Sequence, residues 1–277
     1  MKYENFRSWI IRLYNLVFQG EGMKIIRSIK CVHALLLLTF FGVAHAEGRS
    51  YTIGVEDFEN ILPYSQYSNN VYSGLGKDIL DLFAKKKGYT FIYKAYPVKR
   101  ANSMFFAGEL DFRFPDNPYW VADQKTGINI KYAPVLGFTD GIVLLPKNRN
   151  KGIENLKKLG IPTGFTPYKY LGLINEGKIK LFEAYRYNEL YHQVIAGRVD
   201  GAYVNIKVAR FYFSQIKKSD DLPVVFDPSL PHSTGFHYLS SIKHPEVIAE
   251  LDTFLKDANN KPAIEELKRA YHFDRED

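Results

Sequence analysis

Two stretches of the sequence place polar side chains where a predicted β-strand ends. They read AGELDFRFPDN, residues 107–117, and AGRVDGAYVN, residues 196–205. The strand residues lead to Asp116 and Asn117 in the first stretch and to Asn205 in the second. A carboxylate accepts hydrogen bonds and pairs with cations, whereas a side-chain amide both donates and accepts. These residue types at strand ends are suited to binding a small polar molecule.

The two stretches share one local order, which indicates a structural unit used twice. In each, a glycine follows a helical pattern, as is common at helix C-termini, and an aspartate (Asp111 or Asp200) precedes the strand. Ligands of open α/β sheets bind beyond the carboxyl ends of the strands. We therefore expect Asp116 and Asn205 to face a cleft from opposite walls. Asp111 and Asp200 lie at the other end of the strands and are expected to be structural.

Charged residues near other predicted element ends are further candidates. Glu56 and Asp57 follow the first strand, so that either one lines the cleft or both serve a turn or a helix start. Arg100 begins a helix after a strand, and is either a ligand contact or a solvated surface residue. Arg113 alternates with phenylalanines on a strand, and is either a cleft charge or part of an ion pair between elements.

Three uncharged residues complete the set of predicted ligand contacts. Tyr72 and Trp120 either pack against a ligand, where an aromatic face can hold a cation, or belong to the core. Thr166 lies where a helix is expected to start. Its hydroxyl and the free backbone N–H groups there form either an anion site or an ordinary helix N-cap.

Several classes of enzyme site are absent from the sequence. It contains no GxxxxGK[ST], HExxH or GxSxG motif, and GLG at residues 74–76 is only a fragment of a dinucleotide fingerprint. The five histidines after residue 46 do not have the spacing of metal ligands. The sequence therefore predicts no cofactor, no metal site and no catalytic group identified by motif.

Strand and helix patterns alternate along the chain, which favours a mostly parallel sheet covered by helices. Strands are expected at 51–55, 90–96, 110–114, 140–146, 161–165, 180–185, 199–204 and 235–241. Helices are expected at 76–88, 98–108, 153–160, 168–177, 188–197, 206–216, 246–258 and 263–271. Each candidate residue falls at or near the boundary of one of these elements.

The N-terminal 46 residues have the layout of a leader with a secretory signal peptide. From Met23, the expected translation start, basic residues precede an apolar run over 34–43 and the small-residue box Ala44-His45-Ala46. The apolar run has ten residues, against about 20 for a membrane span. We therefore expect cleavage before Glu47 and export to the periplasm, with a retained anchor helix as the alternative.

Removal of the leader changes the composition on which function depends. The net charge falls from +7 to +3, because the leader holds six basic and two acidic residues. A nucleic-acid partner is therefore not indicated. The only cysteine, Cys31, is also removed, which excludes disulfides and thiolate chemistry from the exported part.

Taken in order, these motifs resemble type II periplasmic solute-binding proteins of family 3, which include amino-acid-binding receptors. The resemblance covers residues 50–273. It is carried by YTIGVE, Pro63-Tyr64, GLGKDILDLFAKKKG, AGELD, IKYAPV, GIVLLPKN, IENLKKLGIPTGF and AGRVDGAYVN. It implies an α/β fold of two lobes, each a mostly parallel sheet flanked by helices. Lobe 1 would comprise 47–140 and 236–277, and lobe 2 would comprise 141–235, joined by crossover strands near 141–145 and 235–239.

The resemblance implies a monomer that captures a small polar, nitrogen-containing solute by closing its lobes, and that serves an ABC permease or a membrane sensor. Two departures argue against the usual α-amino-acid grip. PYWVADQK places Asp123 near the position of the arginine that holds a ligand carboxylate, and Asn205 replaces an aspartate. The alternative is an enzyme on the same fold, of the cyclohexadienyl-dehydratase kind. Its general acid would be one of four carboxyl groups, Glu56, Asp57, Asp116 or Asp123.

Overall fold

The computed structural model describes residues 48–59, 61–216, 218 and 222–273. The predicted signal peptide, its cleavage site before Glu47 and Cys31 lie outside the described residues. The chain from Arg49 onward forms one compact unit. No helix in the described ranges combines the length and the apolar character that crossing a membrane requires.

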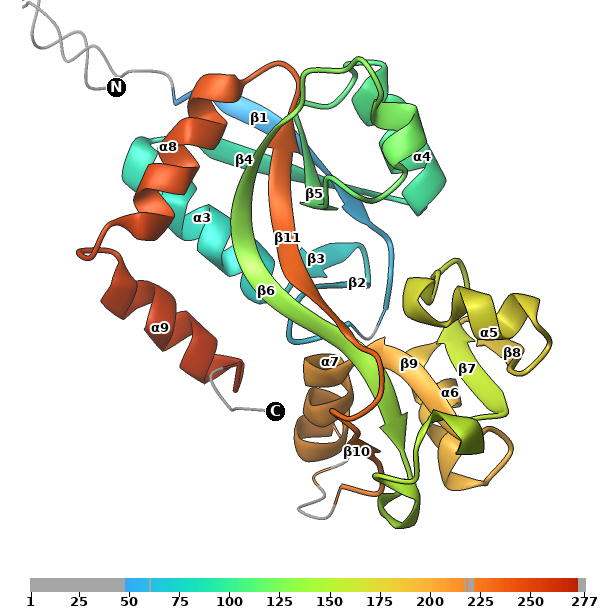
Figure 1. Ribbon diagram of the computed structural model, residues 1–277. Coiled ribbons are helices and arrows are strands. Elements are labelled where there is room, and N and C mark those ends of the chain that lie inside the picture. The colour runs from blue at the N-terminus through green and yellow to red at the C-terminus, as the bar shows by residue number, and fades with distance from the viewer. Residues whose placement is uncertain (1–47, 60, 217, 219–221, 274–277) are drawn as a thin grey trace, which may run out of the picture. The chain divides into compact units, whose positions relative to one another are not determined.

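The described part of the chain is built on one sheet of nine strands (Figure 1). The order of the strands is β4-β1-β5-β11-β6-β9-β7-β8, and β10 pairs with β6 at the side. Their bounds are β1 Ser50–Glu56, β4 Thr90–Tyr96, β5 Phe112–Asp116, β6 Lys131–Leu144, β7 Lys158–Pro162, β8 Lys180–Ala184, β9 Gly201–Asn205, β10 Val225–Phe226 and β11 Ser233–Ser241. A separate hairpin pairs β2 (Gln66–Ser68) with β3 (Val71–Ser73).

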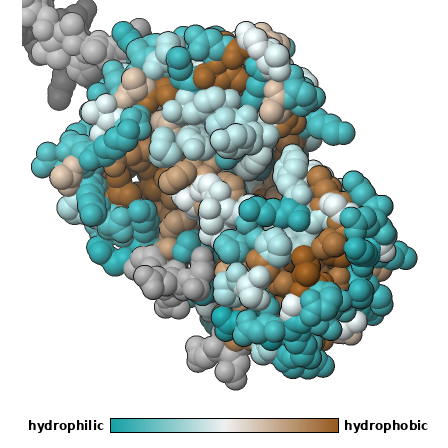
Figure 2. Space-filling model, viewed as in Figure 1, coloured by the Kyte–Doolittle hydropathy of each residue, from teal (hydrophilic) through white to brown (hydrophobic). Residues whose placement is uncertain are grey.

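Helices cover the strands at both ends of this sheet (Figure 1). The α-helices are α3 Leu75–Lys87, α4 Val98–Phe106, α5 Leu171–Asn175, α6 Tyr187–Ile195, α7 Ile206–Phe211, α8 Pro245–Lys256 and α9 Lys261–Ala270. Apolar faces of α3 and α8 meet the strands in one core, in which Ile79, Phe83 and Leu251 are fully buried. A second core includes Leu159 and Ile142, on β7 and β6. Polar residues dominate the face shown in Figure 2.

Two long strands join the two groups of parallel strands. β1 pairs in parallel with β4 and β5, and β7 pairs in parallel with β8 and β9. β11 runs antiparallel to β5 and to β6, and the end of β6 runs antiparallel to β9. In Figure 1, β6 (green) and β11 (orange) pass side by side from the upper group of strands to the lower. The predicted fold, with two lobes joined by crossover strands, is confirmed.

The unit that the sequence repeats is present in both groups of strands. Gly108 and Gly197 end the helices α4 and α6 with φ of 73° and 67°, a conformation that glycine adopts without strain. The carboxylate of Asp111 accepts a hydrogen bond from Thr52 N at 2.8 Å. That of Asp200 accepts one from Lys158 N at 2.7 Å. The structural role predicted for the two aspartates is confirmed.

One predicted helix is wrong. Residues 153–160 form a 3-10 turn, Ile153–Asn155, and then enter β7 at Lys158. Leu159 pairs with Gly201, and the carboxylate of Asp200 binds the backbone N–H groups at the start of the strand. These long-range contacts decide the structure of a segment whose local pattern favours a helix.

Candidate functional site

The carboxyl ends of the central strands bring polar groups of both halves together. β1 ends at Glu56, whose Oε1 lies 3.0 Å from Arg113 Nη2 on β5. Arg113 is 2% exposed and also donates to Phe114 O (2.9 Å) and to Asn102 Oδ1 (3.2 Å). Of the two roles considered for Arg113, the structure has the ion pair. Burial raises the pKa of Glu56, and Arg113 opposes part of that rise.

Asp116, at the end of β5, is buried and has partners for both carboxylate oxygens. Lys125 Nζ lies 2.7 Å from Oδ1, and Ser240 Oγ donates to Oδ2 at 2.6 Å. Arg100 lies exposed, with its guanidinium 5.1 Å from the centre of the Tyr96 ring. The cation beside Asp116 is therefore Lys125, from the 3-10 turn that follows β5.

Asn117 is held by the backbone around it. Its Nδ2 donates to Phe236 O on β11 at 3.0 Å, and its Oδ1 accepts from Tyr119 N at 3.0 Å. Asn117 thus ties the end of β5 to a crossover strand. Both of its side-chain polar atoms are used within the protein.

Asn205 connects β9 to the other crossover strand. Its Oδ1 caps helix α7 by accepting from Val208 N at 3.2 Å, and its Nδ2 donates to Asp140 Oδ1 at 3.2 Å. Asp140 lies directly opposite Asn205 in the β6–β9 pairing. Burial raises the pKa of Asp140 to about 7, and the Asn205 hydrogen bond lowers it by less.

Tyr187 links this pair to the end of β1. It begins helix α6, is 6% exposed, and packs its ring against that of Phe165 at 6.1 Å. Burial raises its pKa well above the ordinary value, and the neighbouring carboxyl groups of Asp140 and Glu56 raise it further. A single tyrosine of one half is therefore close to carboxyl groups on β6 and on β1.

The two predicted aromatic contacts are both packed within the fold. Tyr72 is 6% exposed and stacks on Tyr93 with ring centres 5.4 Å apart. Its ring also lines a groove of about 430 Å³ between the β2–β3 hairpin and β4. The Trp120 ring packs against the ring of His237, with ring centres 5.8 Å apart. Burial lowers the pKa of His237 to about 3, so this histidine is neutral at ordinary pH.

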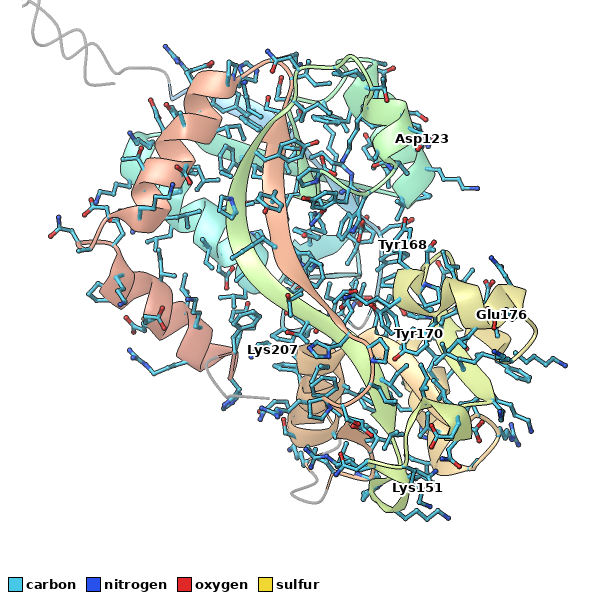
Figure 3. All side chains as sticks on the ribbon, in the orientation of Figure 1. Asp123, Lys151, Tyr168, Tyr170, Glu176 and Lys207 are labelled. Atoms are coloured by element: carbon cyan, nitrogen blue, oxygen red, sulfur yellow. The ribbon has the colours of Figure 1, made fainter. Side chains whose placement is uncertain are left out.

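The remaining candidates lie toward solvent. Thr166 is exposed, and the helical segment expected at 168–177 begins at Tyr168 as a 3-10 turn whose cap residue is Pro167, so Thr166 is not the N-cap. Asp57 is partly buried, and its backbone N–H donates to Tyr96 O. Asp123 is exposed on the 3-10 turn Ala122–Lys125. In Figure 3, Asp123 lies in the upper part of the unit, and Tyr168, two residues after Thr166, lies near the middle, above Tyr170.

Sequence reasoning did not single out Asp140, Lys125 or Tyr187. Asp140 stands within the quoted stretch DGIVLLP and Lys125 within PYWVADQK, so both were visible only as parts of longer motifs. The cross-strand register that pairs Asp140 with Asn205 is the signal that identifies the first of them. Within the described residues, no group of three or more metal-ligating side chains is found.

Comparison with known proteins identifies the fold. No protein-family model matches the chain, and no curated protein matches its sequence. Among solved structures, a periplasmic binding protein of an arginine transport system from Legionella pneumophila has a TM-score of 0.62 at 14% identity. The match covers 81% of this chain and 100% of that one.

Two further structures extend the comparison. A histidine kinase sensor domain similar to periplasmic binding proteins has a TM-score of 0.62 at 16% identity, with 81% of this chain and 96% of that one covered. An ancestral amino-acid-binding protein, a precursor of cyclohexadienyl dehydratase, has a TM-score of 0.59 at 18% identity, with 80% and 95% covered. At such low identity the likeness establishes architecture alone. The chain has the two-lobed fold of periplasmic binding proteins.

Proposed function

We propose that this chain is a periplasmic solute-binding protein that captures a small polar, nitrogen-containing solute between its lobes for uptake or sensing. The observation that supports it is the meeting of Glu56, Asp140, Tyr187 and Asn205, which come from both groups of strands and from a crossover strand. A solute held there touches both lobes at once. Binding therefore favours the closed arrangement of the lobes over the open one.

The proposed lobes are 47–140 with 236–277, and 141–235. The residues proposed to line the cleft include Glu56, Asp57, Asp116, Asn117 and Asn205 as the strand-end set. Tyr72, Arg100, Trp120 and Thr166 are the other proposed ligand contacts. Since Asp116 is already paired with Lys125, its contribution to the cleft is a neutralised ion pair rather than a free negative charge.

A thermal-shift screen of the protein from Glu47 onward tests this proposal. The screen contains amines, amino acids, guanidines, sugars and dicarboxylates. A solute at 100 times its dissociation constant adds about 2.7 kcal/mol to the free energy of unfolding, a rise in melting temperature that is readily measured. A screen in which no solute of any class raises the melting temperature contradicts the proposal.

The partner is proposed to be an ABC permease or a membrane sensor, since solved neighbours include a transport-system binding protein and a histidine kinase sensor domain. Location in the periplasm follows from the predicted leader. Mass measurement of periplasmic material tests it: a chain beginning at Glu47 is expected. A periplasmic chain that retains Cys31 contradicts cleavage after Ala46.

An enzyme on this fold is the second candidate, and Asp140 is the observation that favours it. A carboxyl group with a pKa of about 7 suits a general acid at neutral pH. The stabilising solute is incubated with the protein and followed by mass spectrometry. Turnover that is lost in Asp140→Asn supports the enzyme, and an unchanged solute supports binding.

A further inference from the structure

Three carboxyl groups at the meeting point of the strands differ in what neutralises them. Glu56 has Arg113 at 3.0 Å, and Asp116 has Lys125 at 2.7 Å. Asp140 forms no ion pair with any described residue. Its one side-chain hydrogen bond to the described part of the chain comes from the neutral amide of Asn205 at 3.2 Å. Asp140 is thus the one carboxyl group of the three whose cation the described protein does not supply.

The groups around Asp140 do not change this balance. The titratable side chains that face it are Tyr187 from α6 and Tyr203 from β9. The Tyr203 hydroxyl donates instead to Ser233 Oγ at 3.0 Å. The Tyr187 side chain is close enough to the carboxyl groups of Asp140 and Glu56 for both to raise its pKa. Among the described residues, the site therefore holds a carboxyl group without a cation beside a tyrosine side chain.

A charged carboxylate removed from water needs a cation or several hydrogen bonds, because one amide donor does not replace its hydration. In the ligand-free protein, protonation relieves this cost, in line with a pKa of about 7 for Asp140. A cation bound in the cleft relieves it as well. The two are alternatives, since a carboxyl group that keeps its proton no longer attracts a positive charge.

We infer that Asp140 is the group that receives the positively charged nitrogen of the solute, an alkylammonium or a guanidinium group. This inference rests on the proposed solute-binding function. Asn205 holds one carboxylate oxygen, and the Tyr187 hydroxyl accepts a hydrogen bond from the same cation. The phenyl ring of Phe165, next to Tyr187, provides an aromatic face against which the solute cation can pack.

Capture of the cation is coupled to loss of a proton. The carboxylic acid of Asp140 gives its proton to solvent, and the resulting carboxylate pairs with the solute cation. Affinity therefore rises with pH up to about 7 and then levels off. Between pH 6 and pH 8 the ionised fraction of Asp140 changes about tenfold, and the affinity changes by about the same factor.

Matched pairs of solutes that differ in charge test the inference. The probes are 1,4-diaminobutane against 1,4-butanediol, and butylguanidine against N-butylurea, each titrated by calorimetry at pH 8 and pH 6. The cationic member of a pair is expected to bind, more weakly by about tenfold at pH 6, and the neutral member is not. Asp140→Asn is expected to weaken binding of that cation by roughly 30-fold or more and to remove its pH dependence.

Asp252→Asn is the matched control, because it removes one negative charge from an exposed pair with Lys256 on α8. It is expected to leave affinity unchanged. Circular dichroism and thermal unfolding establish that both variants are folded. Equal binding of the neutral and cationic members, or unchanged cation affinity in Asp140→Asn, overturns the inference while solute binding itself stands. Failure of every solute in the wider screen overturns the proposed function instead.

Discussion

Asp140, Glu56 and Asp116 are three carboxyl groups in one small region, and their surroundings give each a different role. An adjacent arginine or lysine neutralises Glu56 and Asp116. Among the described residues, Asp140 has only a hydrogen bond from the Asn205 amide. The free energy of unfolding should respond to changes at these residues in different ways, because removing a partnered charge and removing an unpartnered one have opposite effects.

For ligand-free protein, we expect Asp140→Asn to increase stability above pH 7. The folded pKa of Asp140, about 7, lies above the ordinary value of 3.8. The folded state therefore binds more protons between these values, and stability decreases as pH rises from about 4 to about 7. Asparagine does not ionise, so the variant keeps its stability as the pH rises. Its free energy of unfolding at pH 8 should therefore exceed that of the parent by up to about 4 kcal/mol.

Urea unfolding at pH 4.5 and pH 8 measures this difference. Little gain is expected at pH 4.5, where Asp140 is protonated in the folded protein. An equal gain at both pH values would show that the substitution acts through packing and not through charge. Asp252→Asn provides the exposed-carboxylate control at both pH values.

Lys125→Met is expected to destabilise the fold, because it leaves the buried Asp116 carboxylate without its cation. Breaking a buried ion pair from one side costs about 3–5 kcal/mol. Replacing both residues, as Lys125→Met with Asp116→Asn, should restore part of the loss. Urea unfolding of the two single variants and the double variant gives the coupling free energy between Lys125 and Asp116.

The exposed pair of Lys178 and Glu176 offers the control for that measurement. Both side chains are more than half exposed, so Lys178→Met should change stability by less than about 1 kcal/mol. A similar loss in Lys125→Met and Lys178→Met would mean that the buried pair with Asp116 has no special weight.

At the scale of elements, a helix, a glycine and a strand recur in the same order in both groups of strands. Gly108 and Gly197 adopt positive φ, and an alanine Cβ at either would contact nothing within 4 Å. The only penalty of an alanine there is the left-handed backbone, about 1–2 kcal/mol. We expect Gly108→Ala and Gly197→Ala to destabilise the protein by this amount.

Gly172 is the control, since its Cβ would also meet nothing within 4 Å but its φ is not in the left-handed region. Gly172→Ala, within helix α5, should be neutral or stabilising by up to about 1 kcal/mol. Thermal unfolding of the three variants compares them directly. A loss in Gly172→Ala as large as in the other two would contradict the assignment of the penalty to backbone conformation.

At the scale of the whole unit from residue 49, the crossover strands β6 and β11 carry the connection between the two groups of parallel strands. A solute that contacts both groups should draw them together by rotation about these strands. We expect the radius of gyration from solution scattering to decrease when the solute found in the screen saturates the protein. An unchanged radius at saturation would indicate a rigid site. A non-binding solute from the same screen serves as the control.

The sequence by itself determined most of the elements and the fold. The alternation of strand and helix patterns located β1, β4, α3 and α4 closely, because each has a strong local period and a clear boundary such as Gly88. The repeated AGELD and AGRVD stretches determined the paired helix–strand units, since a glycine at a helix end is a local signal. The aspartate of each stretch then binds the backbone of a strand distant in sequence. The long extent of β6 and the start of β7 did not follow from local pattern, because pairing with distant strands decides them.

The tertiary structure alone decided which charges meet. Lys125 and Asp116 are nine residues apart, but only the turn between them brings the amine to the carboxylate. Asp140 and Asn205 are 65 residues apart and face each other through the register of β6 and β9. Side-chain pairing depends on strand register, on burial and on which of the possible partners lies within contact distance. Register and burial follow from the complete fold and not from a local stretch of sequence. The candidate carboxylates Glu56 and Asp116 could therefore be predicted, but the absence of a cation beside Asp140 could not.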